Sequence, residues 1–241
     1  MRQKILKSFC TLIFSLLFIP TWAQQQDTLT IKKTTTQEQA EPLLETLKEK
    51  PVPVFCGIAI TADLSGLGMK LFSADFAQME ASLRLNFKEK YFPAFELGYG
   101  ECNYISEETN KRYSTKAPYL RIGMDYNFTK KRNGNRLYAG VRYGLSRYNY
   151  NMYDEGFNDP VWDNPTPFRL ENEPATAHWA EALFGLETKL WSFLRVGWTL
   201  RYKLLLKHTE EKHGNPWYIP GFGKYASSTC FGGTFNIIFN I

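Results

Sequence analysis

The sequence predicts an all-β fold, an eight-stranded antiparallel up-and-down transmembrane β-barrel with short periplasmic turns and long extracellular loops. Apolar and polar residues alternate with a period of two in eight segments of roughly ten residues, the length of a tilted membrane strand. The connections between these segments are alternately short and long, as in outer-membrane barrels. Aromatic residues gather at the segment ends beside the short connections, which is typical of a membrane interface.

The clearest segment, Leu194–Lys207, reads LRVGWTLRYKLLLK. Every second residue from Leu194 is apolar or aromatic, whereas Arg195, Arg201 and Lys203 occupy alternate positions and Lys207 continues their face. Since successive side chains of a strand point to opposite sides, the segment has one apolar and one cationic face. A helix would scatter these charges around its circumference, so the pattern predicts a strand.

The other predicted strands follow the same alternation along the chain: Val54–Leu64, Ala77–Phe87, Pro93–Cys102, Leu120–Phe128, Leu137–Ser146, Ala180–Thr188 and Phe231–Ile241. The short connections, one of which carries the Asn133-Gly134 turn signal, are Lys88–Tyr91, Thr129–Arg136 and Lys189–Phe193. The long ones are Ser65–Asp75, Tyr104–Ala117, Asn149–His178 and His208–Ala226.

Residues 1–23 have the pattern of a secretory signal peptide, with a basic start, a short apolar run and small residues before a cleavage point after Ala23. Residues 24–52 are polar and predict a periplasmic tail or linker, so the barrel would occupy residues 53–241. The formal net charge is +5, and +2 without the cations of the signal peptide. This balance argues against nucleic acid as a partner.

Three cysteines follow the signal peptide: Cys56, Cys102 and Cys230. An odd number cannot pair completely within one chain, and their spacing matches no metal-binding pattern. We expect small buried side chains, and the sequence predicts neither a metal site nor a cofactor.

Alternation alone leaves open which face meets water, because a soluble lipocalin-like barrel would place the apolar face inside around a ligand. The polar face is rich in glycine, which a narrow lumen needs beside large side chains. It also mixes charges of both signs that can pair across a lumen. We therefore predict an apolar exterior and a lumen charge network of Glu80, Arg84, Glu96, Arg121, Asp125, Arg142, Glu181, Glu187, Arg195, Arg201 and Lys203.

Five segments carry a family resemblance: YFPAFELGYG (Tyr91–Gly100), APYLRIGMDYNF (Ala117–Phe128), NRLYAGVRYGLS (Asn135–Ser146), PWYIPGFGK (Pro216–Lys224) and GGTFNIIFNI (Gly232–Ile241). Over nearly the whole mature chain the sequence resembles an uncharacterised family of Bacteroidetes outer-membrane barrels, the domain of unknown function 6048. The resemblance implies the outer membrane of a Gram-negative cell, contact with its lipid, and insertion by the barrel-insertion machinery. It implies no activity. Phe239 lies two residues before the terminal Ile241, a departure from the usual terminal aromatic residue.

Two interpretations of the lumen charges are an ion path, as in a porin-like protein, and a salt-bridged plug. Side chains just fill an eight-stranded barrel, and unpaired buried charges are costly. The similar numbers of acids and bases therefore favour the plug.

The long connections hold candidate binding residues: Tyr153, Phe157, Trp162, Phe168, Trp217, Tyr218 and Phe222. Aromatic residues of this kind are typical of binding surfaces for a protein or another surface ligand. The alternative is that they fold over the barrel mouth as a lid. We expect a structural or surface-interaction role through these segments, with the ligand left open.

A lipid-modifying enzyme of the barrel rim is another alternative, because some small barrels carry a histidine, a serine and an acid there. The candidate members are His178, His208, His213, Glu181, Glu210, Glu211 and Ser227. Their spacing shows no catalytic triad, so we predict that the protein is not an enzyme.

Overall fold

The computed structural model describes residues 52–66, 75–129, 134–156, 167–209 and 214–241. The predicted signal peptide and all but the last residue of the predicted tail lie outside these residues. Within them, no helix has the length and apolar character required to cross a membrane. The strands are β1 (Phe55–Asp63), β2 (Phe76–Phe87), β3 (Tyr91–Ile105), β4 (Arg112–Asn127), β5 (Arg136–Asp154), β6 (Phe168–Lys189), β7 (Leu194–His208), β8 (Tyr218–Ile219), β9 (Gly223–Lys224) and β10 (Thr229–Asn240).

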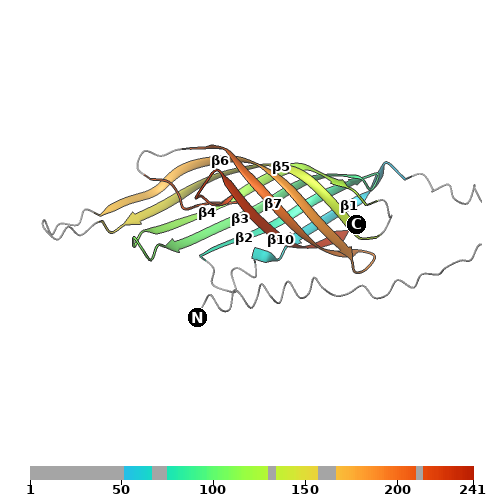
Figure 1. Ribbon diagram of the computed structural model, residues 1–241, viewed down its shortest axis with the longest axis horizontal. Coiled ribbons are helices and arrows are strands. Elements are labelled where there is room, and N and C mark those ends of the chain that lie inside the picture. The colour runs from blue at the N-terminus through green and yellow to red at the C-terminus, as the bar shows by residue number, and fades with distance from the viewer. Residues whose placement is uncertain (1–51, 67–74, 130–133, 157–166, 210–213) are drawn as a thin grey trace, which may run out of the picture. The chain divides into compact units, whose positions relative to one another are not determined.

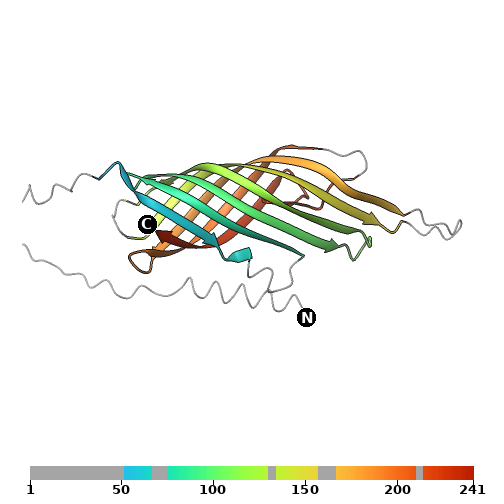
Figure 2. The same cartoon turned by 180° about the vertical axis from the view of Figure 1, so that it is seen from behind.

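Eight strands form a closed antiparallel barrel in the order β1-β10-β7-β6-β5-β4-β3-β2 (Figures 1 and 2). Each predicted segment corresponds to one of these strands, so the predicted eight-stranded barrel is confirmed. The chain end closes the ring, because Ile58 and Ile241 exchange backbone hydrogen bonds of 3.0 and 2.8 Å. Closure leaves no open sheet edge.

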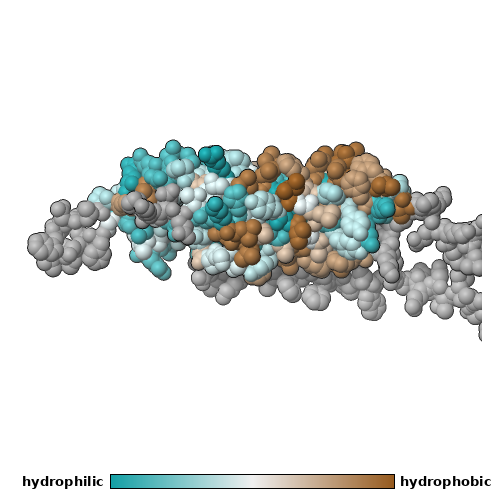
Figure 3. Space-filling model, turned by 90° about the horizontal axis from the view of Figure 1, so that it is seen from above, coloured by the Kyte–Doolittle hydropathy of each residue, from teal (hydrophilic) through white to brown (hydrophobic). Residues whose placement is uncertain are grey.

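The apolar face of each barrel strand points outward and the polar face points inward. On β7, Leu200 is 68% exposed, whereas the neighbouring Arg201 is only 5% exposed. Apolar surface gathers on the part of the barrel beside the short turns, and polar surface covers the end to which β5 and β6 extend (Figure 3). A soluble barrel with an apolar cavity requires the inverse arrangement, so the lipocalin-like alternative does not fit.

Glycines make room for large side chains in the narrow lumen. Gly98 pairs with Tyr119 and Gly144 pairs with Trp179, each across neighbouring strands. A Cβ atom at Gly98 would lie 2.1 Å from the Tyr119 ring, and one at Gly144 would lie 2.2 Å from the Trp179 ring. These inward glycines are therefore required by packing.

The long connections are shorter than predicted, because the hydrogen-bonded ladder continues beyond the alternating segments. The predicted connection Asn149–His178 is largely strand, since β5 runs to Asp154 and β6 begins at Phe168. Of the connection His208–Ala226, residues 218–224 form the small β8–β9 hairpin. Long polar strands do not need lipid-facing apolar residues, which is why the alternation gave no signal there.

The face of Lys207 also differs from the prediction. A bulge shifts the β6–β7 register, so that Trp179 pairs with Leu205 but His178 pairs with Lys207. Because one extra residue reverses every following side chain, Lys207 joins the outer face. It is exposed, unlike Lys203 in the lumen.

Candidate functional site

The lumen holds all eleven residues of the predicted charge network, and each is buried. At its centre, Arg121 of β4 contacts Glu80 of β2, Glu181 of β6 at 3.0 Å and Glu96 of β3 at 3.3 Å. Arg201 of β7 contacts the same three carboxylates at 3.1, 3.0 and 2.8 Å. Two guanidinium groups thus join side chains from five strands. Tyr119 and Trp179 add hydrogen bonds to Glu80 and Glu181.

A second group of charges lies nearer the short turns. The Arg142 guanidinium joins Glu96 at 2.8 Å to Asp125 at 2.7 Å. Arg84 forms an ion pair with Glu187, and Arg195 donates a 2.9 Å hydrogen bond to the Gly134 carbonyl. The two groups are continuous, because Glu96 bonds to arginines of both.

The charged side chains of the lumen leave little space between them. A polar cavity of about 20 Å³ lies between Glu80, Arg84, Glu96, Asp125, Arg142 and Arg201, among other residues. This volume has room for roughly one water molecule. Paired charges therefore fill this part of the lumen.

The β8–β9 hairpin lies inside the end of the barrel opposite the short turns. Its turn Ile219-Pro220-Gly221-Phe222 closes with a 3.1 Å hydrogen bond from Phe222 N to Ile219 O. Pro at the second position and Gly221 with φ of +83° at the third match a type II turn. Lys203 Nζ holds this turn by donating to the carbonyls of Gly221 at 2.7 Å and Phe222 at 3.0 Å.

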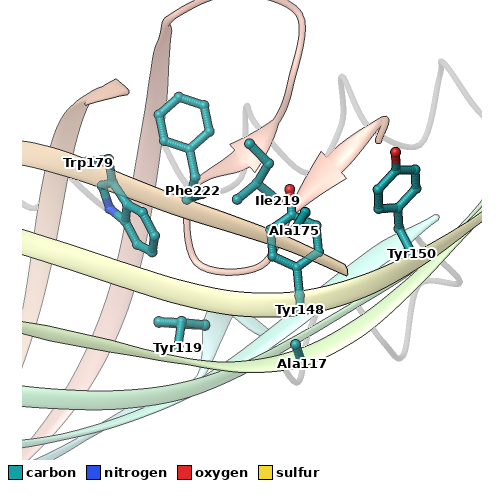
Figure 4. Packing of buried hydrophobic residues seen from close by; sticks show 9 residues of the cluster. Ala117, Tyr119, Tyr148, Tyr150, Ala175, Trp179, Ile219 and Phe222 are labelled. Atoms are coloured by element: carbon teal, nitrogen blue, oxygen red, sulfur yellow. The ribbon is translucent and has the colours of Figure 1, made fainter. Parts of the chain in front are cut away.

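The hairpin completes an apolar core within the barrel. Ile219 and Phe222 belong to one buried cluster with Trp179, Tyr148 and Tyr119 of the barrel wall (Figure 4), and the centroids of the Phe222 and Trp179 rings are 6.3 Å apart. Ile219, Phe222 and Trp179 are all fully buried. Burial also raises the pKa of Tyr218, whose neutral hydroxyl donates a 3.2 Å hydrogen bond to Gln78 Oε1.

We predict that Gly221→Ala displaces the hairpin. A Cβ atom there would lie 2.5 Å from the Tyr119 ring, and the backbone conformation is strained for any other residue. In the folded chain, chymotrypsin should cleave near Phe222 at least several times faster in the variant. Gly233→Ala is the matched control, since its Cβ atom would find its nearest neighbour at 3.8 Å. Equal cleavage of both variants would show that the hairpin does not depend on this close contact.

An open groove of about 550 Å³ lies beyond the hairpin, at the outer ends of β3–β6. Its lining includes Tyr104, Arg112, Tyr113, Asn151, Tyr153 and Arg169. Beside it, the Trp217 ring stacks on Tyr104 with centroids 4.0 Å apart, and Lys224 Nζ lies 5.1 Å from the Trp217 ring centroid. At the strand ends, a 2.9 Å ion pair with Lys111 lowers the pKa of Asp154. The groove thus combines aromatic rings with polar groups of both signs.

The structure separates the predicted binding residues into different environments. Tyr153 lines the groove, Phe168 is exposed at the start of β6, and Trp217 stacks beside the groove. Tyr218 and Phe222 are buried in the lumen, as in the lid alternative. Phe157 and Trp162 lie outside the described residues. Tyr104 and Tyr113 were missed, although both belong to a connection that the alternation marked as long.

The candidate members of a hydrolytic site are not brought together among the described residues. Nδ1 of His178 bonds to the Tyr143 hydroxyl at 2.7 Å on the outer wall. Nε2 of His208 bonds to the Tyr148 hydroxyl at 2.7 Å inside the barrel. Glu181 belongs to the arginine network, and the Ser227 hydroxyl donates to the Thr229 carbonyl. His213, Glu210 and Glu211 lie outside the described residues.

Within the described residues, no cluster of histidine, cysteine and acidic side chains has the arrangement of a metal site. Cys102 is buried, and Cys56 and Cys230 are partly buried; all are free thiols. The prediction of small buried side chains therefore holds for Cys102 and only in part for Cys56 and Cys230.

Comparison with solved structures gave weak overall likenesses to small barrels. Neisserial surface protein A is 10% identical, with a TM-score of 0.43, over 77% of this chain and 97% of the other. The N-terminal barrel domain of Pseudomonas aeruginosa OprF is 13% identical, with a TM-score of 0.36, over the same shares of the two chains. CarO2 of Acinetobacter baumannii is 11% identical, with a TM-score of 0.39, over 78% and 99%.

No curated protein matches the chain. A family model does match it, over residues 5–241. This match spans every strand of the barrel and the hairpin in its lumen. The chain is a member of the family described as domain of unknown function (DUF6048).

Proposed function

We propose that this protein is a barrel of the Gram-negative outer membrane with a closed lumen, and that its outer mouth serves a structural or surface-recognition role. The observation that carries the proposal is the inverted distribution of side chains. Apolar side chains cover the outside of a closed barrel, and charged side chains pair within it. In water this arrangement would expose a continuous apolar belt, which soluble proteins avoid.

The dimensions of the belt support the membrane location. On β3, the outward rings of Tyr91 and Tyr99 are eight residues apart. At about 3.3 Å per residue and a tilt of roughly 40°, this is about 20 Å along the barrel axis, near the ~25 Å apolar band of outer-membrane barrels. Phe128, Trp191 and Phe193 add exposed aromatic rings at the short-turn end.

The filled lumen supports a role other than conduction. An ion would have to displace the guanidinium groups of Arg121 and Arg201 from three buried carboxylates each. Above them, the hairpin held by Lys203 closes the mouth. The groove, by contrast, is open and lies on strands that project beyond the apolar belt, so recognition is placed there in this proposal. Insertion by the barrel-insertion machinery is part of the same proposal.

A photoreactive residue in place of Tyr153 tests both parts of the proposal in living cells. Outer-membrane fractions are prepared after irradiation and run on a gel with and without boiling. We expect the chain in this fraction, a band that migrates differently when unboiled, and a discrete crosslinked product. The matched control carries the photoreactive residue at Lys88, which is exposed in a short turn at the other end.

The two readouts are independent. A chain found in the soluble periplasmic fraction would reject the membrane location. A heat-modifiable chain with no adduct at Tyr153, or with the same adduct at Lys88, would reject recognition through the groove and leave a purely structural role.

A further inference from the structure

We infer that the outer wall of β4–β7 binds the phosphorylated headgroup of a lipid in the leaflet that surrounds the long strand ends. The inference rests on the proposed membrane location. Its basis is a row of basic residues on the outside of the barrel, formed by the cations Lys116, Arg147 and Lys207 together with His178. Each residue comes from a different one of the neighbouring strands β4, β5, β6 and β7. None of them belongs to the lumen network or to the groove.

The bulge in β7 creates the row. Without it, Lys207 would follow Lys203 into the lumen, and the outer wall would lose a cation. With it, Lys207 pairs with His178 on the outside. Arg147 and Lys116 are also exposed, and the ammonium of Lys116 lies 5.9 Å from the centroid of the outward Tyr99 ring.

The tilt of the strands brings the side chains of β5, β6 and β7 to one height. Arg147 pairs with Thr176, two residues from His178, which in turn pairs with Lys207. Residues that pair across neighbouring strands form rows perpendicular to the strands. Because the strands are tilted by roughly 40°, each row rises along the barrel axis by about 3 Å from β5 to β6 and again from β6 to β7, toward the long strand ends. Two residues along β6 descend about 5 Å, which offsets that climb. The three side chains therefore begin within roughly 5 Å of one level.

Lys116 reaches the same level from β4. Its neighbour Thr115 pairs with Tyr150, three residues beyond Arg147 on β5. Such a row of paired residues falls along the barrel axis by about 3 Å from β5 to β4, and Lys116 is one residue lower than Thr115. Lys116 and Arg147 therefore lie within roughly 5 Å of one height.

The row lies directly above the apolar belt. Arg147 is four residues beyond the outward Tyr143, which is about 10 Å along the axis at the same tilt. The outward side chains of Leu145 and Leu206 lie between the tyrosine rings of the apolar belt and the cations. This is the depth at which lipid phosphates are found, with acyl chains below them.

The cations are confined to one wall. Lys116 lies directly across from the outward Glu101 of β3, so Arg147 and Lys207 are the cations available for a ligand. The outward residues of the opposite strands are uncharged: Met79, Ala81, Leu83, Leu85 and Phe87 on β2, and Phe231, Gly233, Phe235, Ile237 and Phe239 on β10. Arg147 and Lys207 form no ion pair with another described residue. Lysine and arginine side chains that only reach toward water at the membrane surface would not need to gather on one side of the barrel.

Phosphate is the group that this row fits. A guanidinium and an ammonium at one height can bind phosphate oxygens from two sides. The leucines below favour a lipid over a soluble phosphate, because they extend the contact to acyl chains. Each cation near an anionic membrane surface strengthens binding by about fivefold, so the loss of two should weaken binding about tenfold or more.

The test uses the full chain purified in detergent and native mass spectrometry with diphosphoryl lipid A as the probe. Arg147→Gln/Lys207→Gln should bind this lipid about tenfold more weakly than the unmodified chain. The matched control, Lys88→Gln/Lys189→Gln, removes the same charge at the short-turn end and should bind normally. With enzymatically dephosphorylated lipid, all three proteins should bind equally and weakly. Excess inorganic pyrophosphate should not displace the lipid.

The outcomes separate this inference from the proposed function. All three proteins should migrate differently when unboiled, since none of these substitutions touches the lumen or the belt. Heat-modifiable proteins that bind diphosphoryl lipid A equally would overturn the lipid site alone. Displacement by pyrophosphate would overturn the lipid assignment in favour of a soluble anion. If the unmodified chain is not heat-modifiable, the membrane proposal itself fails.

Discussion

Leu200→Arg should prevent stable assembly of the barrel in a membrane. Leu200 is 68% exposed in the middle of the apolar face of β7, where the proposed function places hydrocarbon. An arginine near the bilayer midplane costs about 2–4 kcal/mol, which is a factor of about thirty to several hundred in the folding equilibrium. The measurement is urea unfolding of the chain in lipid vesicles, followed by the loss of the heat-modifiable band.

Asn149→Arg is the matched control for this prediction. Asn149 also points outward from a barrel strand, but it lies on β5 beyond the apolar belt and beyond Arg147. There the new charge would meet water, so we expect a change within about 0.5 kcal/mol. If Leu200→Arg were as stable as Asn149→Arg, the outer face of β7 would not contact lipid.

Arg121→Met should destabilise the barrel by about 3–5 kcal/mol, because it leaves buried carboxylates without their shared cation. Arg121 is fully buried and contacts Glu80, Glu96 and Glu181. Only Arg201 would then serve all three acids. The same urea titration in vesicles measures the free energy of unfolding.

Two further variants show whether the network itself is responsible. Arg112→Met removes an arginine from an exposed 3.3 Å pair with Glu155 and should cost less than about 1 kcal/mol. Glu80→Gln in the Arg121→Met background removes an unneutralised acid. The double variant should therefore lose about 0.5–3 kcal/mol less than the sum of the two single losses. Simple additivity would mean that the lumen charges are stabilised independently, by water or by the backbone.

The alternation was sufficient to predict the barrel because lipid and lumen impose opposite demands on neighbouring residues. From Leu194 to Leu204, each Leu, Trp or Tyr of β7 that meets the outside is followed by a residue that meets the lumen. The eleven lumen charges could be named for the same reason, and all are buried. Their partners could not be named, since Arg201 and Glu80 are far apart in sequence and meet only across the closed ring.

The sequence by itself determined the number of strands, the direction of each face and the need for inward glycines, because these depend on local period and residue size. Tertiary structure alone decided the rest. Strand pairing beyond the belt extended β5 and β6, a single bulge moved Lys207 to the outer wall, and the hairpin entered the lumen. Each depends on contacts between distant segments, namely a register across strands or a cavity that Ile219 and Phe222 can fill. The alternation of residues along the sequence does not specify which distant segments contact one another.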